Sequence, residues 1–142
     1  MRAVQLLFIL LSVGGLAYWF TMDTDSQVAQ VPEEPTSAIV EINIPKTLSA
    51  NAQVGKVAFD AKCSICHGAN AVGQTDVAPP LVHKIYEPSH HADESFQRAV
   101  SLGVRQHHWP FGNMPPVEGL TRGDVSMIIA YVRELQRANG IN

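Results

Sequence analysis

Cys63-Ser64-Ile65-Cys66-His67 is the stretch that most constrains the fold: it holds both cysteines of the 142-residue chain, and a histidine directly follows the second. Two thiols three positions apart lie on one face of a helical turn, so both can form thioether bonds to one porphyrin. The histidine then lies next to the iron. This C-x-x-C-H spacing is typical of covalent haem attachment, and we expect one haem c with its iron.

A C-x-x-C pair also occurs in zinc sites and in dithiol redox proteins. Zinc would need two further soft ligands, and the chain has no other cysteine. A thioredoxin-like fold would place the pair near a strand–helix–strand pattern, which this sequence lacks. A haem-free dithiol reductant or metal-trafficking protein that uses Cys63, Cys66 and the histidines stays open as a minor alternative.

An apolar segment of seventeen residues, 4–20, lies at the N-terminus and would span roughly 26 Å as a helix. That is the short end of what a bilayer needs. Only Arg2 and the amino terminus are positive before it, and acidic residues follow, so the positive-inside rule places residue 1 in the cytoplasm. We expect residues 1–21 to be a single-pass anchor in a bacterial inner membrane, with a cleaved signal segment as the alternative.

Residues 22–45 are predicted to form an acidic, proline-containing linker. Five acidic residues and no Lys or Arg occur between positions 21 and 45. Such a composition favours a solvated tether, on which the domain that follows could swing between neighbours at the periplasmic side. Val40, Ile42 and Ile44 alternate with polar residues, which predicts a short strand before Pro45.

Residues 46–142 are predicted to form a small all-helical domain with long loops. The first helix begins at an N-cap, Ser49 or Asn51, and leads into the cysteine motif. Its apolar residues recur at helical spacing. They are Val54, Val57, Ala58, Ala61 and Ile65.

Two further helices are predicted in this domain. One runs from Asp93, as its N-cap, to a stop at Gly103. The other begins with Thr121 and Asp124, which form a capping-box pattern, and ends at residues 139–140. Its apolar stripe comprises Val125, Ile128, Ile129, Val132 and Leu135.

The charge of the chain excludes one class of partner. The formal net charge is −3, and residues 46–142 carry nine basic and eight acidic side chains. This near balance gives no sign of a basic surface, so we expect no nucleic-acid partner.

Three further segments follow the cysteine motif along the chain. They are Pro79-Pro80-Leu81, Asn113-Met114-Pro115 and a terminal helix that contains Tyr131. With these, residues 50–138 resemble the class I c-type cytochromes, which are small helical monohaem domains. Gly55 and Phe59 resemble the family's small and aromatic pair, which implies that the first helix crosses the last one near Tyr131.

The resemblance implies that Met114 is the second axial ligand of the iron. A thioether is a soft, neutral donor that favours ferrous iron and raises the reduction potential. Residues 109–116 contain three prolines and no helical periodicity, which predicts an ordered loop. The alternative is that Met114 only packs in this loop. Met127 lies in the last helix, where we expect core packing.

The resemblance also implies partners around the haem. The backbone carbonyl of Pro80 would accept a hydrogen bond from the iron-bound His67. Pro79 is the nearest substitute, and the choice between the two carbonyls stays open because this chain has Ala78 and Pro79 where the family often has a glycine. Leu81 would line the haem pocket, and Trp109 or Tyr86 would reach a propionate.

Five further histidines are expected mainly in solvated loops or beside the propionates: His83, His90, His91, His107 and His108. Two alternatives stay open. One of them replaces Met114 on the iron, or the paired ones bind a second metal such as copper or zinc.

The expected function is one-electron transfer from one redox protein to another at the membrane, without a small-molecule substrate. With His67 and Met114 on the iron, no coordination position is open to oxygen or peroxide. The protein would be an electron carrier rather than an enzyme, either free-standing or as a subunit of a larger oxidoreductase. The alternative is a haem-based gas or peroxide sensor, or a small peroxidase, in which Met114 is displaced.

Overall fold

Six helical segments account for the regular structure of residues 37–142, the part of the chain that the computed structural model describes. They are α2 (Ala50–Lys62), α3 (Ser64–His67), the 3₁₀ turns η1 (Ala69–Ala71) and η2 (Lys84–Tyr86), α4 (Asp93–Leu102) and α5 (Arg122–Ala138). Within these residues there are two isolated bridges and no strand, which confirms the predicted all-helical class.

The expected anchor, residues 1–21, lies outside the described residues, as do residues 22–36 of the expected linker. Among the helices of residues 37–142, none has the length and apolar character that a bilayer crossing requires.

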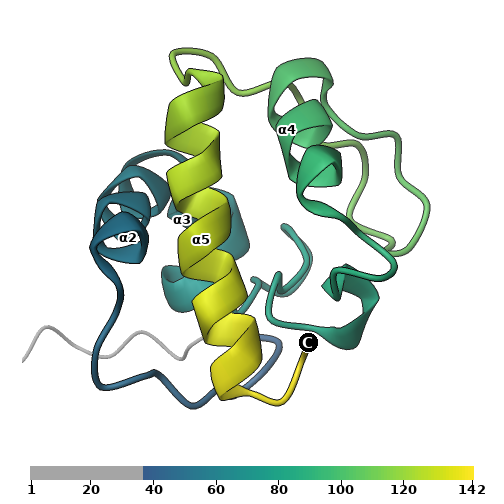
Figure 1. The fold of residues 1–142 in the computed structure, drawn as a ribbon. Coiled ribbons are helices and arrows are strands. Elements are labelled where there is room, and N and C mark those ends of the chain that lie inside the picture. The colour runs from purple at the N-terminus through teal and green to yellow at the C-terminus, as the bar shows by residue number, and fades with distance from the viewer. Residues whose placement is uncertain (1–36) are drawn as a thin grey trace, which may run out of the picture. The chain divides into compact units, whose positions relative to one another are not determined.

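The core is centred on the contact between α2 and α5, which lie side by side in Figure 1. A Cβ atom on Gly55 would lie 1.8 Å from the backbone oxygen of Met127, so only glycine permits this approach. Next to it, the buried rings of Phe59 and Tyr131 meet edge to face with centroids 5.6 Å apart. The helix crossing implied by the family resemblance is confirmed.

The predicted apolar face of α2 is wrong except at Ala58, which packs against the core, whereas the helix itself and its N-cap Ser49 are confirmed. Val54 is 59% exposed and Val57 is 71% exposed, while Ile65 in α3 is 80% exposed. The buried positions of α2 are Ala52, Gly55 and Phe59. Close helix contact selects small side chains, and these do not stand out in a hydropathy pattern.

α4 begins one residue later than predicted. Ala92 is the N-cap, and Asp93 is the first helical residue. The Asp93 carboxylate accepts a hydrogen bond from Nε of Arg133 at 2.9 Å, so it forms an ion pair instead of capping its own helix. The end at Gly103 is as predicted, and φ there is +73°.

α5 begins with the predicted capping box. The Thr121 hydroxyl accepts from the Asp124 N–H at 3.2 Å, and the Asp124 carboxylate accepts from the Thr121 N–H at 2.8 Å. The predicted apolar stripe is buried against the rest of the core.

Two buried polar side chains of α5 hold the loop that precedes α4. Arg133 donates to the carbonyl oxygens of Tyr86, at 2.6 Å, and His91, at 2.5 Å. Gln136 donates to the carbonyl oxygens of Leu81, at 2.8 Å, and Tyr86, at 3.1 Å. Because Arg133 also donates to Gln136 Oε1 at 2.7 Å, one hydrogen-bond network fastens this loop to the last helix.

Residues 37–45, the described end of the expected linker, contact the helical domain. The Val40 N–H donates to the Val72 carbonyl at 3.3 Å, and Asn43 and Asn139 exchange hydrogen bonds of 2.7 and 2.9 Å. The short strand predicted here is wrong, because these backbone groups bond to loop and helix-end residues rather than to another strand.

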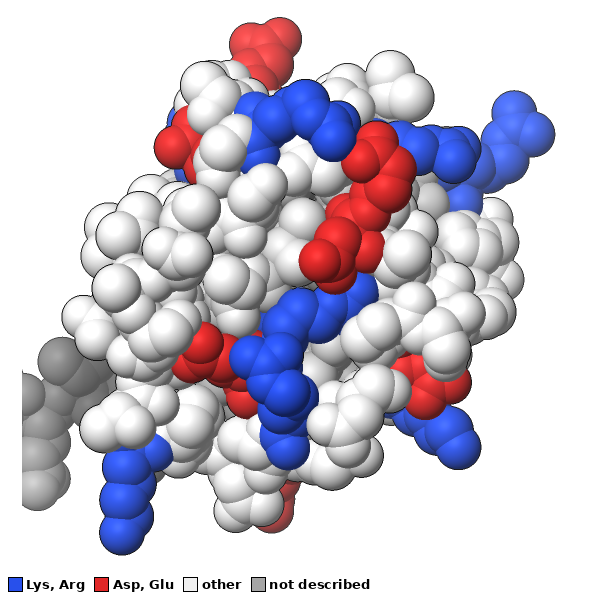
Figure 2. Space-filling view, in the orientation of Figure 1, with Lys and Arg blue, Asp and Glu red and all other residues white. Residues whose placement is uncertain are grey.

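Acidic and basic side chains are interspersed over the face drawn in Figure 2. Exposed pairs such as Lys56–Asp60 and Arg122–Glu94 balance each other. This face therefore presents no extended positive surface of the kind that binds a phosphate backbone.

Candidate haem-binding site

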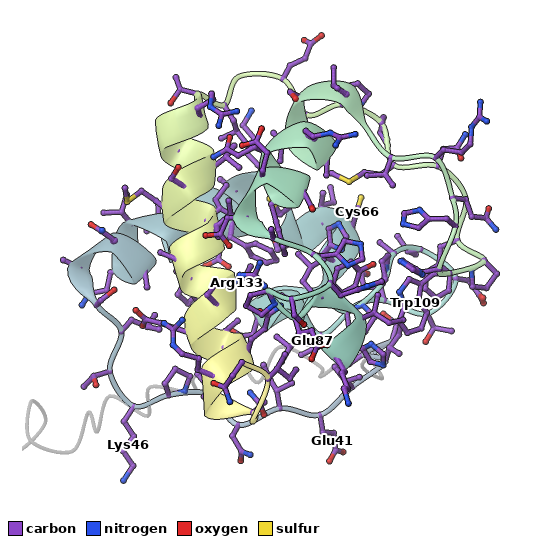
Figure 3. The ribbon with its side chains drawn as sticks, turned by 45° about the vertical axis from the view of Figure 1, so that its right-hand side comes forward. Glu41, Lys46, Cys66, Glu87, Trp109 and Arg133 are labelled. Carbon is purple, nitrogen blue, oxygen red and sulfur yellow. The ribbon has the colours of Figure 1, made fainter. Side chains whose placement is uncertain are left out.

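The end of α2 presents the two cysteines. Cys63 is the C-cap of α2, and its carbonyl accepts from the N–H groups of Cys66, at 3.1 Å, and His67, at 2.9 Å. These bonds wind residues 64–67 into the single turn α3. Cys63 is half-buried, Cys66 is exposed, and both are free thiols. In Figure 3, Cys66 lies on the same side of α5 as α4 and the long loops.

Gln74, which the sequence analysis did not single out, closes the far end of this turn. Its Nε2 donates to the carbonyl oxygens of Ile65 at 2.8 Å, Cys66 at 3.0 Å and Ser64 at 3.3 Å. Carbonyls at a helix C-terminus lack partners within the helix, so this side chain supplies what the turn needs. No local sequence pattern marks a glutamine for this role.

A tight turn brings a proline segment back against the motif. The Gly73 N–H donates to the His67 carbonyl at 2.7 Å, and φ at Gly73 is +76°. A Cβ on Gly73 would lie 2.5 Å from the Pro80 nitrogen. Glycine therefore permits both the backbone conformation and the close approach.

His67 is buried, and its Nδ1 lies 2.8 Å from the carbonyl oxygen of Pro79. A carbonyl can only accept, so Nδ1 carries the proton and Nε2 keeps its lone pair. Burial lowers the pKa of His67, and the hydrogen bond to Pro79 partly opposes that shift. A neutral imidazole with a free Nε2 is the form that ligates a metal.

The carbonyl partner of His67 belongs to Pro79, the alternative that the sequence offered, so the first expectation of Pro80 is wrong. In an extended segment successive carbonyls point to opposite sides, and only one of the two can face the ring. Pro80 itself is fully buried. Leu81 packs against the core, and its N–H donates to the Ala71 carbonyl at 2.9 Å.

The environment of Cys63 does not favour thiol exchange. Burial raises the pKa of Cys63 to about 11, and the neighbouring Cys66 adds to the rise. A dithiol reductant needs a thiolate near neutral pH, because the thiolate is the nucleophile. Burial therefore disfavours Cys63 as the attacking thiol.

Met114 lies at the end of a closed loop, in agreement with the ordered loop that the prolines predict. Its N–H donates to the Val104 carbonyl at 3.0 Å, and its carbonyl accepts from the Val104 N–H at 2.9 Å. Across the loop, Asn113 Oδ1 accepts from the Gln106 N–H at 2.9 Å. A Cβ on Gly103 would lie 2.5 Å from the Met114 backbone oxygen, so the end of α4 and this loop are pressed together.

Trp109 provides a test of whether a haem fits here. Its Nε1 is buried, and within residues 37–142 no acceptor has hydrogen-bond geometry to it. Burial raises the pKa of Tyr86 to about 12, and the neighbouring Trp109 partly opposes the rise. An unsatisfied buried donor costs free energy, and a carboxylate such as a haem propionate would satisfy it. The residues present therefore fit a haem.

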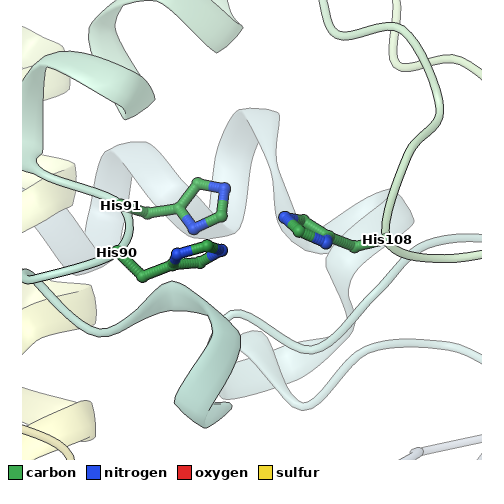
Figure 4. A group of neighbouring side chains, drawn as sticks. All are labelled: His90, His91 and His108. Atoms are coloured by element: carbon green, nitrogen blue, oxygen red, sulfur yellow. The ribbon is translucent and has the colours of Figure 1, made fainter.

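Four of the other histidines gather between two loops. The ring centroids of His90 and His91 lie 4.7 Å apart, and those of His107 and His108 lie 4.2 Å apart. Figure 4 shows His90, His91 and His108 together. Loss of hydration lowers the pKa of His108, and the neighbouring His107, His91 and His90 lower it further. His83 stands apart from this group and packs edge-on against Trp109 at 5.2 Å.

The fold and the site together define a class of protein. A helix ends in a C-x-x-C-H turn, a buried histidine offers a free Nε2, and a methionine loop follows before a last helix that crosses the first. These are the features of a small c-type haem protein.

Comparison with known proteins agrees with this class. The family model described as Cytochrome c matches residues 52–136, and the chain belongs to this family. Members of this family hold a covalently bound haem c with its iron, and this membership indicates haem-based electron transfer.

Among curated proteins, the chain is similar to a cbb3-type cytochrome c oxidase subunit CcoP of Azospirillum brasilense. The two are 41% identical in an alignment 61 residues long, and the match covers 39% of this chain and 19% of the relative. The chain therefore spans about a fifth of the relative's length. No solved structure matches the chain.

Proposed function

We propose that this protein is a membrane-anchored one-electron carrier that holds one haem c through thioether bonds from Cys63 and Cys66. His67 would bind the iron through Nε2, and Met114 would supply a second ligand, its thioether sulfur. The observation that carries the proposal is the hydrogen bond from His67 Nδ1 to the Pro79 carbonyl, because it fixes the tautomer that leaves Nε2 free.

Bound haem supplies a centre that gains and loses one electron. The chain orients it: the His67–Pro79 bond sets the imidazole plane, and Gln74 holds the turn that carries the cysteines. Trp109 Nε1, with Tyr86 beside it, would hold a propionate, and Leu81 would line the pocket. The thioether of Met114 would raise the reduction potential relative to a nitrogen ligand.

The redox partners would be membrane proteins reached from the periplasmic side of a bacterial inner membrane. In support, the relative from Azospirillum brasilense is a subunit of a cbb3-type cytochrome c oxidase, and the segment at 4–20 is apolar. We propose that the chain passes electrons to or within such an oxidase complex. A tether at 22–36 would raise the local concentration of the haem domain near these partners.

Replacing the proposed sulfur ligand tests the iron coordination. Met114→Ala, made in a host that attaches haem, should lose the sulfur-to-iron charge-transfer band of the oxidised protein and have a lower reduction potential. Met127→Ala is the matched control, because Met127 lies in α5 and should leave both unchanged. Absorption spectra and a redox titration measure the two properties.

Two results would contradict the proposal. An unchanged charge-transfer band in Met114→Ala would remove Met114 from the iron. Rapid binding of carbon monoxide by the ferrous wild-type protein at neutral pH would instead favour the gas or peroxide sensor.

A further inference from the structure

A group of histidines outside the proposed haem ligands has the geometry of a second metal site. One ring nitrogen each from His90, His91 and His108 lies within 4.8 Å of the other two. The first two come from the turn before α4, and the third comes from the loop that ends at Met114. Two segments distant in the sequence therefore bring three imidazoles together.

The hydrogen bond of His91 selects the tautomer that a metal needs. Its Nδ1 lies 2.6 Å from the carbonyl oxygen of Ile85, which can only accept, so Nδ1 carries the proton. In the neutral ring Nε2 then keeps its lone pair. Metal-binding histidines usually donate their other N–H to a carbonyl or carboxylate in this way.

The turn that carries His90 and His91 is rigid. Both N–H groups donate to the Glu87 carbonyl, at 3.0 and 2.8 Å, and the His91 carbonyl accepts from the buried Arg133 at 2.5 Å. Arg133 is itself paired with Asp93, so its positive charge is balanced beside the group. A supported backbone lowers the entropy cost of gathering ligands around an ion.

The opposite loop is also closed. The pairing of Val104 with Met114, together with the bond from the Gln106 N–H to Asn113 Oδ1, brings its two ends together. His108 lies between these ends and faces the first loop in Figure 4.

We propose that His90, His91 and His108 form a binding site for one divalent late transition-metal ion, such as Zn²⁺ or Cu²⁺, separate from the haem iron. Imidazole nitrogens suit these ions, and three of them with one open position make a common four-coordinate site. Bonds of about 2.1 Å would place tetrahedral ligands roughly 3.4 Å apart, so side-chain rotations that shorten the present separations of up to 4.8 Å by at most about 1.4 Å would complete the site.

Zn²⁺ is the probe for the test, because it has no redox chemistry with the haem. The full-length, haem-loaded protein is titrated with Zn²⁺ by calorimetry, and the Zn²⁺ environment is measured by X-ray absorption at the zinc edge. We expect one ion per chain with imidazole scattering from three nitrogens. His90→Gln, His91→Gln and His108→Gln should each weaken binding by roughly tenfold or more. His83→Gln is the matched control and should bind Zn²⁺ as the wild type does.

Several outcomes would overturn the proposal. They are equal affinity in the wild type and the three variants, zinc-edge spectra with fewer than three imidazoles, and one ion per two chains together with dimer formation. A His91→Gln or His108→Gln protein whose oxidised haem spectrum shows an altered axial ligand would assign these rings to the iron instead. The X-ray absorption measurement on wild-type protein keeps the test valid should a variant fold poorly.

Discussion

Two groups that lie outside the cysteine motif in the sequence hold the C-x-x-C-H turn in place. The two N–H bonds of the Gln74 amide are shared among three carbonyl oxygens of residues 64–66, and the Pro79 carbonyl orients His67. Gln74 is half-buried, so carbonyls that lose it are only partly compensated by water. A rigid turn keeps thiols and imidazole in one geometry, which a covalent cofactor with a fixed spacing requires.

Removing Gln74 should therefore destabilise the domain. Gln74→Ala is expected to lower the free energy of unfolding by about 1–2 kcal/mol, measured by guanidinium titration of the haem-loaded protein. Gln53→Ala is the control: this exposed side chain donates one hydrogen bond, to Leu48, and its loss should cost less than about 0.5 kcal/mol. Equal effects of the two changes would mean that Gln74 does not support the turn.

Among the helices, the crossing of α2 and α5 has the least room for change. Gly55 permits backbone contact with Met127, and Phe59 fills the space beside it against Tyr131. The Tyr131 hydroxyl also donates to Asn70 Oδ1 at 2.9 Å, so the crossing is connected to the turn that follows His67.

Gly55→Ala should separate the two helices. Its Cβ would lie 1.8 Å from a backbone oxygen that cannot rotate away, so we expect a loss of about 3 kcal/mol or more in thermal unfolding. Gly123→Ala is the matched control, because its Cβ would meet Thr121 Oγ1 at an ordinary 3.5 Å. It should be neutral or stabilise α5 by up to about 1 kcal/mol. A well-tolerated Gly55→Ala would contradict the close crossing.

Because of the capping box of α5, the free energy of unfolding of the domain should decrease at acidic pH. Hydrogen bonds from the Thr121 hydroxyl and N–H lower the pKa of Asp124. The carboxylate thus stabilises the folded state above its unfolded pKa, and this contribution is lost as pH falls through the lower folded value.

Asp124→Asn should therefore be less stable than wild type at pH 7, and the difference should shrink as pH falls below the usual aspartate range. Thermal unfolding followed by circular dichroism between pH 7 and pH 2 measures it. Thr121→Ser keeps the hydroxyl and should retain the wild-type pH dependence. A difference that stays constant over this range would show that the charge of Asp124 does not stabilise α5.

Across the whole domain, the last helix fastens loops that are far from it in sequence. Arg133 and Gln136 together reach the backbone at Leu81, Tyr86 and His91. The same loop supplies Tyr86 to the proposed propionate contact and His91 to the proposed second metal site. One buried network therefore positions both candidate sites.

Arg133→Met should destabilise the domain by about 3 kcal/mol or more, because it leaves buried carbonyls and Gln136 without their donor. Arg122→Met removes an exposed arginine that pairs with Glu94, and solvent screening of this pair should make its loss cost far less. Denaturant unfolding of both variants measures the contrast. Similar values would show that burial of the Arg133 network contributes little.

Several features were predictable because their signals are local. The cysteine spacing, the capping box at Thr121 and Asp124, and the stop at Gly103 each depend on residues within one turn of each other. The positions of Gly55, Phe59 and Tyr131 came from resemblance to a family. The exposed face of α2 was mispredicted, and Pro80 was preferred to the alternative Pro79 as the partner of His67, because hydropathy and proline order do not say which group faces inward.

The cysteine motif by itself predicted the cofactor, because the spacing of its thiols and histidine suits covalent haem attachment, and the match to the cytochrome c family agrees with it. Only the tertiary structure decided which residues hold that motif in place and which histidines lie together. Gln74 reaches back to carbonyls about ten residues earlier, and His108 meets His91 across a helix and a loop. Such contacts depend on how separate segments pack, and no local pattern of residues specifies which distant segments will meet.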